Sequence, residues 1–299
     1  MKILVSGASG LVGNAVVGRL SSRGAHVLRL VRKPSPDQSS EILWNPQKGI
    51  EAAGKLEGLD AVIHLAGEPI AEGRWTEDKK RRIRESRVVG TKILAEALAG
   101  LERKPSAFLS ASAIGYYGSR GSEILTEESR PGDDFLAEVC REWEEATTPA
   151  ARAGIRTVQM RFGIILSSKG GALTKMLMPF KLGIGGRLGS GEQYMSWIAI
   201  DDVVGVVEHL LDTDSLSGPV NTVAPSPVTN REFTKALGDV LSRPTIFPVP
   251  KFAMRLAFGE MADVALLASQ RVEPARLKAS GYVFKYPELK EALRHILKE

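Results

Sequence analysis

The chain has 299 residues, of which 43% are hydrophobic and 25% charged, with a formal net charge of +5. This length predicts one large domain, or one domain with an appendage, and the composition excludes a disordered chain. The lone Cys140 excludes an intramolecular disulfide and a cysteine-rich metal site. We find no N-terminal signal peptide and no apolar run of about eighteen residues, so we expect a cytoplasmic protein without a membrane segment.

The first half of the chain alternates short apolar runs with helical patterns. Strands are predicted at Lys2–Ser6, His26–Val31, Ala61–Leu65, Ala107–Ser110 and Arg156–Arg161. Helices are predicted at Leu11–Arg23, Thr76–Ala99 and Asp133–Ala153. Continuously apolar strands are typical of a parallel sheet covered on both faces. The order of elements therefore predicts an α/β fold, a doubly wound parallel sheet of the Rossmann type.

The second half is less regular. Glycine-rich loops at 169–171 and 183–191 precede a helix that is expected to run from Asp201 or Asp202 to Leu211, with Asp201 as its cap. A proline-rich stretch, 242–252, marks a boundary. We predict a domain of residues 1–240 that includes a smaller substrate lobe, followed by a small C-terminal helical unit at 250–297.

The segment "KILVSGASGLVGNAVVGRL" places Gly7, Gly10 and Gly13 between the first strand and the first helix. Glycines at this turn allow a tight bend, close approach of the backbone to a pyrophosphate, and packing of the helix on the strand. Free N–H groups at the helix N-terminus then face the negative charge. The loop, with Ser9, Leu11 and Val12 between and beside its glycines, is therefore predicted to bind a dinucleotide.

The end of the second predicted strand carries Arg32 and Lys33 and no acidic residue. An acidic side chain there favours a free ribose 2′-hydroxyl, whereas an arginine accommodates a 2′-phosphate. We therefore predict NADP(H) as the cofactor; the alternative is that both are ordinary surface charges.

The strand "DAVIHLAG" ends in Leu65, Ala66 and Gly67, whose small size would let the backbone pass close to the cofactor. His64 lies within the apolar part of this strand, and we expect it to be packed rather than catalytic.

These motifs, with Gly90-Thr91, "SASAIGYYG" and "MRFGIIL", resemble the epimerase/dehydratase group of the extended short-chain dehydrogenase/reductase superfamily. Longer segments such as "RWTEDKKRRIRESRVVGT" and "GSGEQYMSWIAIDD" are similar to the uncharacterised "epimerase family" branch of YfcH type, and this similarity covers the whole chain. The tail resembles a C-terminal domain of unknown function found in that branch.

The resemblance implies catalysis by a Ser or Thr hydroxyl together with a Tyr-x-x-x-Lys pair one helical turn apart. The matching helix, "DDFLAEVCREWEEA", has Leu136 and Cys140 at those two positions, or Phe135 and Val139 if the register shifts by one. Leucine cannot transfer a proton and cysteine carries no permanent positive charge, so the site is non-standard.

Three hydroxyl-bearing residues remain as catalytic candidates, Ser112, Tyr116 and Tyr117, because they follow a strand at the carboxyl edge of the sheet. Ser112 is the first choice for a hydroxyl that contacts the reacting oxygen, although it can also cap backbone groups. Of the two tyrosines, Tyr117 is expected to be a pocket residue first and a proton donor second.

Arg87 stands where relatives often have asparagine. We expect it either to act on a ligand, by binding cofactor phosphate or polarising a substrate, or to form only a surface ion pair. Ile165 either packs on the cofactor or belongs to the core.

The charged run "KKRRIRESR", 79–87, is interpreted as a solvated helix face rather than a nucleic-acid patch. We expect no metal, no nucleic acid and no membrane partner, a monomer or homodimer, and an unknown small-molecule substrate, a sugar nucleotide by analogy only. The leading hypothesis is an NADP(H)-binding epimerase or oxidoreductase with a non-standard site. The alternative is a non-catalytic NADP(H) sensor or scaffold.

Overall fold

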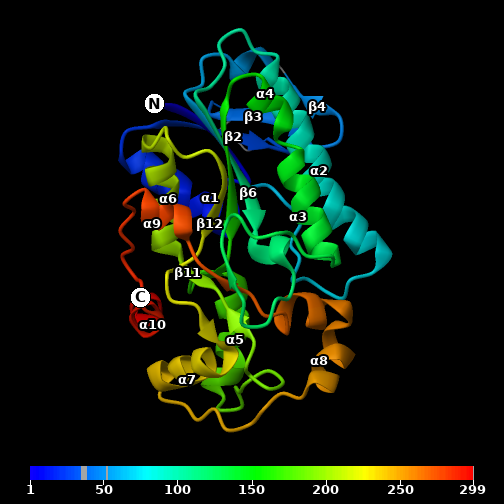
Figure 1. Cartoon of the computed structure of the whole chain (residues 1–299). Coiled ribbons are helices and arrows are strands. Elements are labelled where there is room, and N and C mark those ends of the chain that lie inside the picture. Colours follow the sequence, from blue (N-terminus) through cyan, green and yellow to red (C-terminus); the bar gives the residue numbers. More distant parts are fainter. Residues whose placement is uncertain (35–38, 52, 299) are drawn as a thin grey trace.

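The computed structural model describes residues 1–34, 39–51 and 53–298. Its centre is an eight-stranded sheet in the order β12-β8-β6-β5-β1-β2-β3-β4, in which every pair of described strands is parallel except β3–β4 (Figure 1). The strands are β1 (Lys2–Ser6), β2 (His26–Val31), β3 (Glu41–Asn45), β4 (Gly49–Ile50), β5 (Ala61–His64), β6 (Ala107–Ala113), β8 (Arg156–Phe162) and β12 (Gly218–Thr222). The strand order reverses between β1 and β5, and in such sheets ligands bind at the carboxyl ends beside this point.

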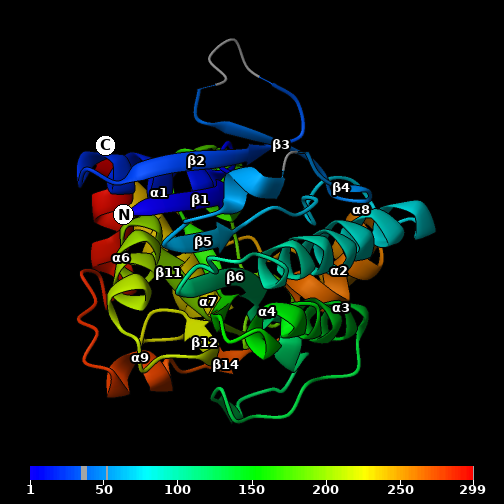
Figure 2. The same ribbon diagram turned by 90° about the horizontal axis from the view of Figure 1, so that it is seen from above.

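Helices cover both faces of the sheet, as Figures 1 and 2 show. One face carries α1 (Leu11–Ser22) and α6 (Ile200–Asp212); the other carries α2 (Glu77–Ala99), α3 (Phe135–Glu145) and α4 (Thr148–Arg152). On the first face Val16 of α1 and Val203 of α6 pack with Ile3 and Val158 of the sheet. On the second, Leu94 packs with Phe108 and with other buried residues. The predicted doubly wound α/β fold is confirmed.

A smaller lobe lies beyond the carboxyl edge of the sheet. It contains β9 (Ile164–Leu166), α5 (Gly171–Lys181), β10 (Tyr194–Met195), β11 (Trp197–Ala199), β13 (Val228–Thr229) and α7 (Asn230–Leu241). Trp197 is fully buried here and its Nε1–H donates to the Ser226 carbonyl at 3.0 Å. The helix α7 begins with a capping box in which Thr229 and Glu232 bond reciprocally to each other's backbone N–H.

The residues after 250 form α8 (Lys251–Phe258), the π-helical turn η3 (Ala262–Leu266), β14 (Arg271–Val272), α9 (Ala275–Ala279) and α10 (Leu289–Lys298). These elements join different hydrophobic clusters of the larger domain: Met261 packs with Trp75, Leu277 with the α1–α6 side, and Leu293 with α7. Strand β14 pairs with β7 (Ile124–Leu125). The predicted boundary at residue 250 stays a prediction, and the segment wraps around the rest of the protein.

Two sequence predictions of local structure need correction. The helix expected at 133–153 is broken into α3 and α4, because Pro149 lacks an N–H and suits only the first turn of a new helix. The elements that the sequence did not predict include strands β3 and β12 and the short turns η1 (Ala53–Leu56) and η2 (Ile114–Tyr117). Asp201 does not cap α6, whose N-cap is Ala199; the buried Asp202 instead accepts the Lys285 and Tyr286 backbone N–H groups.

Candidate functional site

The glycine loop after β1 has the geometry of an anion cradle. Gly7 has φ +67°, and a Cβ there would lie 2.8 Å from the Leu65 carbonyl oxygen. A Cβ on Gly13 would lie 2.1 Å from the Gly7 carbonyl oxygen. Only glycine fits these two positions, because backbone rather than a movable side chain occupies the space.

The N-terminus of α1 is open. Its N-cap is Gly10, and no side chain of the described residues caps the helix. Ser9 and Gly10 are exposed, and Leu11 and Val12 are half-buried. The first N–H groups of the helix therefore point to an accessible space with the positive end of the helix dipole behind them. This loop fits the pyrophosphate of a dinucleotide.

A buried chain of hydrogen bonds holds the neighbouring turn. Ser6 Oγ accepts from the backbone N–H groups of Leu65 and Ala66 and lies 2.6 Å from His64 Nδ1. The Ser6 hydroxyl therefore donates a hydrogen bond to Nδ1, and His64 Nε2–H donates to Thr91 Oγ1 at 3.0 Å. Trp143 Nε1–H also donates to Thr91 Oγ1, at 2.9 Å.

His64 is thus packed, as the sequence predicted, but it has partners that sequence reasoning missed. Complete burial lowers the pKa of His64 to about 4, so the ring is neutral at pH 7. It ties Leu65 and Ala66, which face the glycine loop, to α2 and α3.

The positive residues at the end of β2 remain available to a ligand. Arg32 and Lys33 directly follow the last residue of the strand, and both side chains are exposed. Neither side chain forms a salt bridge with a residue that the structure describes.

Ser112, at the end of β6, belongs to a buried polar network. Its Oγ–H donates to Glu144 Oε1 at 2.6 Å. Arg161 holds the same carboxylate in a bidentate pair, Nε to Oε1 and Nη2 to Oε2, both at 2.8 Å. Because the Ser112 hydroxyl donates its hydrogen bond to Glu144, its lone pairs are left to accept a hydrogen bond from another group.

The two tyrosines of η2 differ in their surroundings. Tyr117 is fully buried; its hydroxyl donates to Asn221 Oδ1 at 2.6 Å and accepts from Arg161 Nη1 at 2.9 Å. Burial raises the pKa of Tyr117 to about 12. Tyr116 is half-buried, and the Arg161 guanidinium lies 3.5 Å from its ring centroid. This environment argues against Tyr117 as a pocket residue or proton donor and leaves Tyr116 as the more accessible phenol.

The two positions on α3 that would carry Tyr and Lys contain no group for proton transfer. Leu136 packs with Phe135 and with residues of η3 in an apolar cluster. Cys140 is buried, and burial raises the pKa of its thiol to about 12. A Cβ on Gly115 would lie 3.4 Å from Leu136 Cβ and 3.6 Å from Cys140 Sγ, so α3 and η2 are in direct contact.

A positive charge comes instead from Arg87 of α2, which packs against Trp143 of α3. Its guanidinium lies 5.0 Å from the Trp143 ring centroid, and Nη1 donates to the Glu68 and Ile83 carbonyls at 3.0 and 3.1 Å. A Cβ on Gly67 would lie 3.4 Å from Arg87 Cζ. Burial lowers the pKa of Arg87, but an arginine remains charged at neutral pH. Of the two predicted alternatives, the surface ion pair is wrong.

Ile165 lies on β9, half-buried against the α1–α6 side of the core. The loop that follows it returns to the glycine loop: Cβ atoms on Gly170 and Gly171 would lie 3.7 and 3.2 Å from the Leu11 side chain. The smaller lobe therefore contacts the start of α1 directly.

The charged run 79–87 is only partly solvated. Lys79 is buried and pairs with Glu68 at 2.8 Å, and Lys80 pairs with Glu260 at 2.7 Å. Interpretation of the whole run as a solvated face is wrong for Lys79 and Arg87, which turn toward the protein.

The described residues include no group of three or more His, Cys, Asp or Glu side chains placed to hold a metal ion. No helix in the same part of the chain is long and apolar enough to cross a membrane.

Fold and site together define a dinucleotide-binding protein of the Rossmann class. Residues 3–222 match the NAD dependent epimerase/dehydratase family, and residues 249–296 match a domain of unknown function, DUF1731. The chain belongs to the NAD dependent epimerase/dehydratase family.

Relatives share nearly the full length of the chain. An epimerase family protein of Mycobacterium bovis is 42% identical over 97% of this chain and 96% of its own. Human epimerase family protein SDR39U1 is 36% identical over 99% of this chain and 100% of its own. The crystal structure of human SDR39U1 with NADPH superposes with a TM-score of 0.91 at 35% identity, covering 100% of this chain and 99% of that one. The predicted resemblance to this branch is confirmed.

A nucleoside-diphosphate sugar epimerase from Corynebacterium glutamicum has a TM-score of 0.82 at 40% identity, covering 99% of this chain and 58% of its own. A UDP-N-acetylglucosamine 4-epimerase from Bacillus cereus, 18% identical with a TM-score of 0.77, shares the fold.

Proposed function

We propose that the protein binds NADP(H) and catalyses an oxidoreductase or epimerase reaction on a small molecule, using a site without Tyr-x-x-x-Lys. The observation that carries the proposal is the open N-terminus of α1 in a glycine loop, with Arg32 and Lys33 exposed at the end of β2. The NADPH bound to human SDR39U1 supports the choice of a phosphorylated cofactor.

NADP(H), when bound, supplies or accepts the hydride. In the direction of alcohol oxidation, Ser112 Oγ would accept the hydrogen bond of the substrate hydroxyl, because its own proton points to Glu144. The proton that the alcohol loses would pass through Ser112 to the Glu144 carboxylate. Arg161 fixes Glu144 and thereby orients Ser112. Tyr116, on the adjacent turn η2, is the phenol that can still reach a substrate. The buried Tyr117 hydroxyl holds Arg161 in place by a hydrogen bond.

Arg87 supplies the fixed positive charge of the site. Its position under Gly67 places the guanidinium beside the turn that faces the glycine loop. Trp143 and the Glu68 carbonyl hold it there, so little conformational entropy is lost when it contacts a ligand oxygen. Ile165 and the Leu65–Gly67 turn would complete the wall on the cofactor side.

The substrate is proposed as a small molecule, with a sugar nucleotide supported only by analogy with the Corynebacterium glutamicum epimerase. A cytoplasmic location, a monomer or homodimer, and the absence of nucleic-acid or membrane partners stay predictions. The first is supported by the single, buried Cys140.

A second candidate function is a non-catalytic NADP(H) sensor or scaffold. It is favoured by Leu136 and Cys140, which leave α3 without an acid or a base. The two functions differ in turnover and not in cofactor binding.

Cofactor choice is tested by fluorescence titration with NADPH and NADH. We expect Arg32→Asp to lower the preference for NADPH by about tenfold or more, since a charge-assisted bond to the 2′-phosphate is lost. An unchanged preference would show that the end of β2 does not read the ribose. Arg87→Met should weaken NADPH binding about tenfold, since a charge-assisted bond to a cofactor oxygen is lost.

Turnover is tested by following NADPH oxidation and NADP reduction over a panel of carbonyl compounds, alcohols and sugar nucleotides. Activity that is lost in Ser112→Ala and reduced in Tyr116→Phe, with cofactor affinity intact, supports the enzyme. Tight cofactor binding without any turnover across the panel supports the sensor.

A further inference from the structure

A groove of about 810 Å³ runs along the outer sides of α1 and α6 and is not part of the catalytic region described above. We call it the α1–α6 groove. Its apolar surface comes from Leu11, Ala15, Ile200, Val204 and Ile296. Gly18 and Gly205 lie along its length, and the loop 167–170 and Lys285 complete its rim. Its volume is within the range of small-molecule sites.

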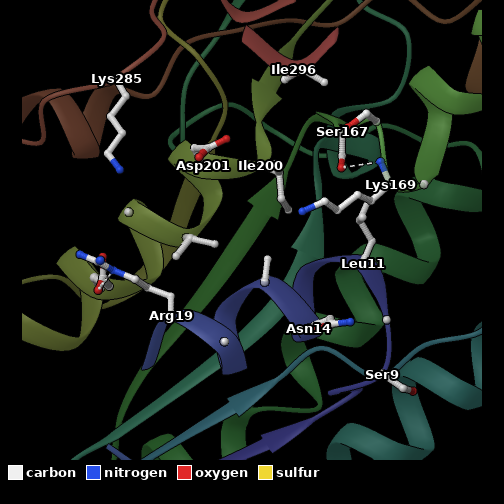
Figure 3. Close-up of a pocket in the computed structure, with 18 residues that line it drawn as sticks. Ser9, Leu11, Asn14, Arg19, Ser167, Lys169, Ile200, Asp201, Lys285 and Ile296 are labelled. Atoms are coloured by element: carbon white, nitrogen blue, oxygen red, sulfur yellow. Dashed lines mark hydrogen bonds and ion pairs between the residues drawn. The ribbon is translucent and has the colours of Figure 1, made fainter. Parts of the chain in front are cut away.

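Two ammonium groups in this groove have no partner. Figure 3 shows the Lys169 side chain crossing toward Ile200 in the middle of the groove, while Lys285 points in from another rim. Neither Nζ forms a hydrogen bond or ion pair with any residue that the structure describes. An unpaired lysine keeps its side-chain entropy and hydration, so it can bind an incoming anion without breaking an existing bond.

One carboxylate of the groove is already neutralised. Glu208 Oε1 accepts from Arg19 Nε at 2.8 Å and from Arg23 Nη1 at 3.0 Å. Asp201 Oδ2 lies 3.4 Å from His295 Nε2, which is charged only when it is protonated. Asp201 lies on the Lys285 side of the groove (Figure 3), so Lys169 is the unpaired positive charge beside the apolar floor that has no carboxylate next to it among the described residues.

We propose that the α1–α6 groove binds a small amphiphilic anion, with its carboxylate or phosphate head at Lys169 and its apolar body on Ala15, Ile200 and Val204. Neither a fully polar anion nor a neutral apolar molecule matches both halves of this surface. The groove shares Ser9, Gly10 and Leu11 with the dinucleotide loop, and Lys169 extends across it toward Ile200 (Figure 3). The proposed site therefore adjoins the dinucleotide loop, and the apolar body lies further along α1 and α6.

The test uses the full chain saturated with NADPH, so that the dinucleotide loop cannot capture the probe. Octanoate, octyl phosphate and the neutral 1-octanol are titrated by calorimetry, with inorganic phosphate as the head group alone. We expect one octanoate or octyl phosphate per chain, and binding of 1-octanol and inorganic phosphate weaker by at least about tenfold. The two anions distinguish a carboxylate from a phosphate head.

Two kinds of variant locate the probe. Lys169→Met should weaken binding of the anion about tenfold, and Lys285→Met, on the side of Asp201, should weaken it less. Lys92→Met, at an exposed lysine on the opposite face, should leave binding unchanged. Gly18→Leu should abolish binding, because Gly18 lines the groove and a Cβ there meets no atom within 4 Å, so the added side chain can occupy the groove. Replacing a helical glycine also favours the helix by about 0.5–1 kcal/mol, so this variant should fold and keep its NADPH affinity.

Three results would overturn the proposal. The first is the absence of binding by both anions. The second is binding of 1-octanol as tight as that of the anions, or unchanged anion binding in the groove lysine variants; either would show that the groove does not recognise the negative charge. The third is retained binding in a folded Gly18→Leu protein, which would place the probe elsewhere, such as on the exposed apolar residues Phe252 and Leu256 of α8.

Discussion

The β1–α1 turn and the β6–α3 region lie at the same edge of the sheet, but they depend on different parts of the chain. In the first, backbone N–H groups and the absence of Cβ atoms at Gly7 and Gly13 create the site. In the second, the site depends on which side chains are present, and Leu136 and Cys140 replace those expected from the resemblance. A backbone site tolerates change around it as long as the glycines remain, whereas a side-chain site can lose or move its chemistry with two substitutions.

The largest effect should come from the ion pair that holds the β6–α3 region. Arg161→Met would leave the Glu144 carboxylate, 14% exposed, without its cationic partner. Breaking a buried pair costs about 3–5 kcal/mol of unfolding free energy. Urea denaturation would measure this loss, and Arg120→Met, whose pair with Glu123 is exposed, should cost no more than about 1 kcal/mol. Equal effects of the two variants would show that the region does not depend on Arg161.

The buried histidine gives a pH dependence. The pKa of His64 is about 4 in the folded protein and about 6.5 when unfolded, so the unfolded state binds the proton more tightly. The stabilisation is complete above pH 6.5 and is lost as pH falls toward 4, in total about 3 kcal/mol. His64→Asn should therefore show a shallower decline of unfolding free energy between pH 7 and 4 than the wild type. His26→Asn, at an exposed position, should keep the wild-type slope; identical slopes for all three proteins would contradict the burial argument.

The role of the glycine loop in cofactor binding can be tested by adding one methyl group at Gly13. Gly13→Ala places a Cβ against the Gly7 carbonyl oxygen, so the loop must shift, and NADPH should bind about a hundredfold more weakly, equivalent to about 2.7 kcal/mol. Gly18→Ala, on the same helix but facing open space, should keep wild-type affinity. Both affinities come from fluorescence titration. Normal affinity in Gly13→Ala would show that the cofactor does not use this loop.

The smallest effect concerns Tyr117. Tyr117→Phe removes the hydroxyl between Asn221 and Arg161 and should cost about 1–3 kcal/mol of unfolding free energy, while any turnover remains. Thermal denaturation and the activity panel would be measured on the same preparation. Loss of turnover with unchanged stability would support the role of proton donor, the second of the two roles expected for Tyr117 from the sequence.

Sequence reasoning reached the elements whose signal is local. The strand at Lys2–Ser6 and the helix from Leu11 follow from apolar patterning and the glycines between them. Sequence reasoning failed where contacts between residues far apart in the chain determine the structure. His64 had no visible partner because Ser6 and Thr91 lie 58 and 27 residues away along the chain. Strand β12 contains Gly218 and Pro219, which weaken a strand pattern, and only its pairing with β8 makes it part of the sheet.

The sequence by itself determined the fold class, the glycine loop and the absence of Tyr-x-x-x-Lys, because each depends on residue type at a short spacing. Only the tertiary structure decided which groups meet at the site. It turned Tyr117 into the interior and placed Arg87 beneath Gly67. It also bound Ser112 to Glu144, 32 residues further along the chain. Burial and the direction of a hydrogen bond depend on neighbours that are far apart in sequence, and packing alone brings them together.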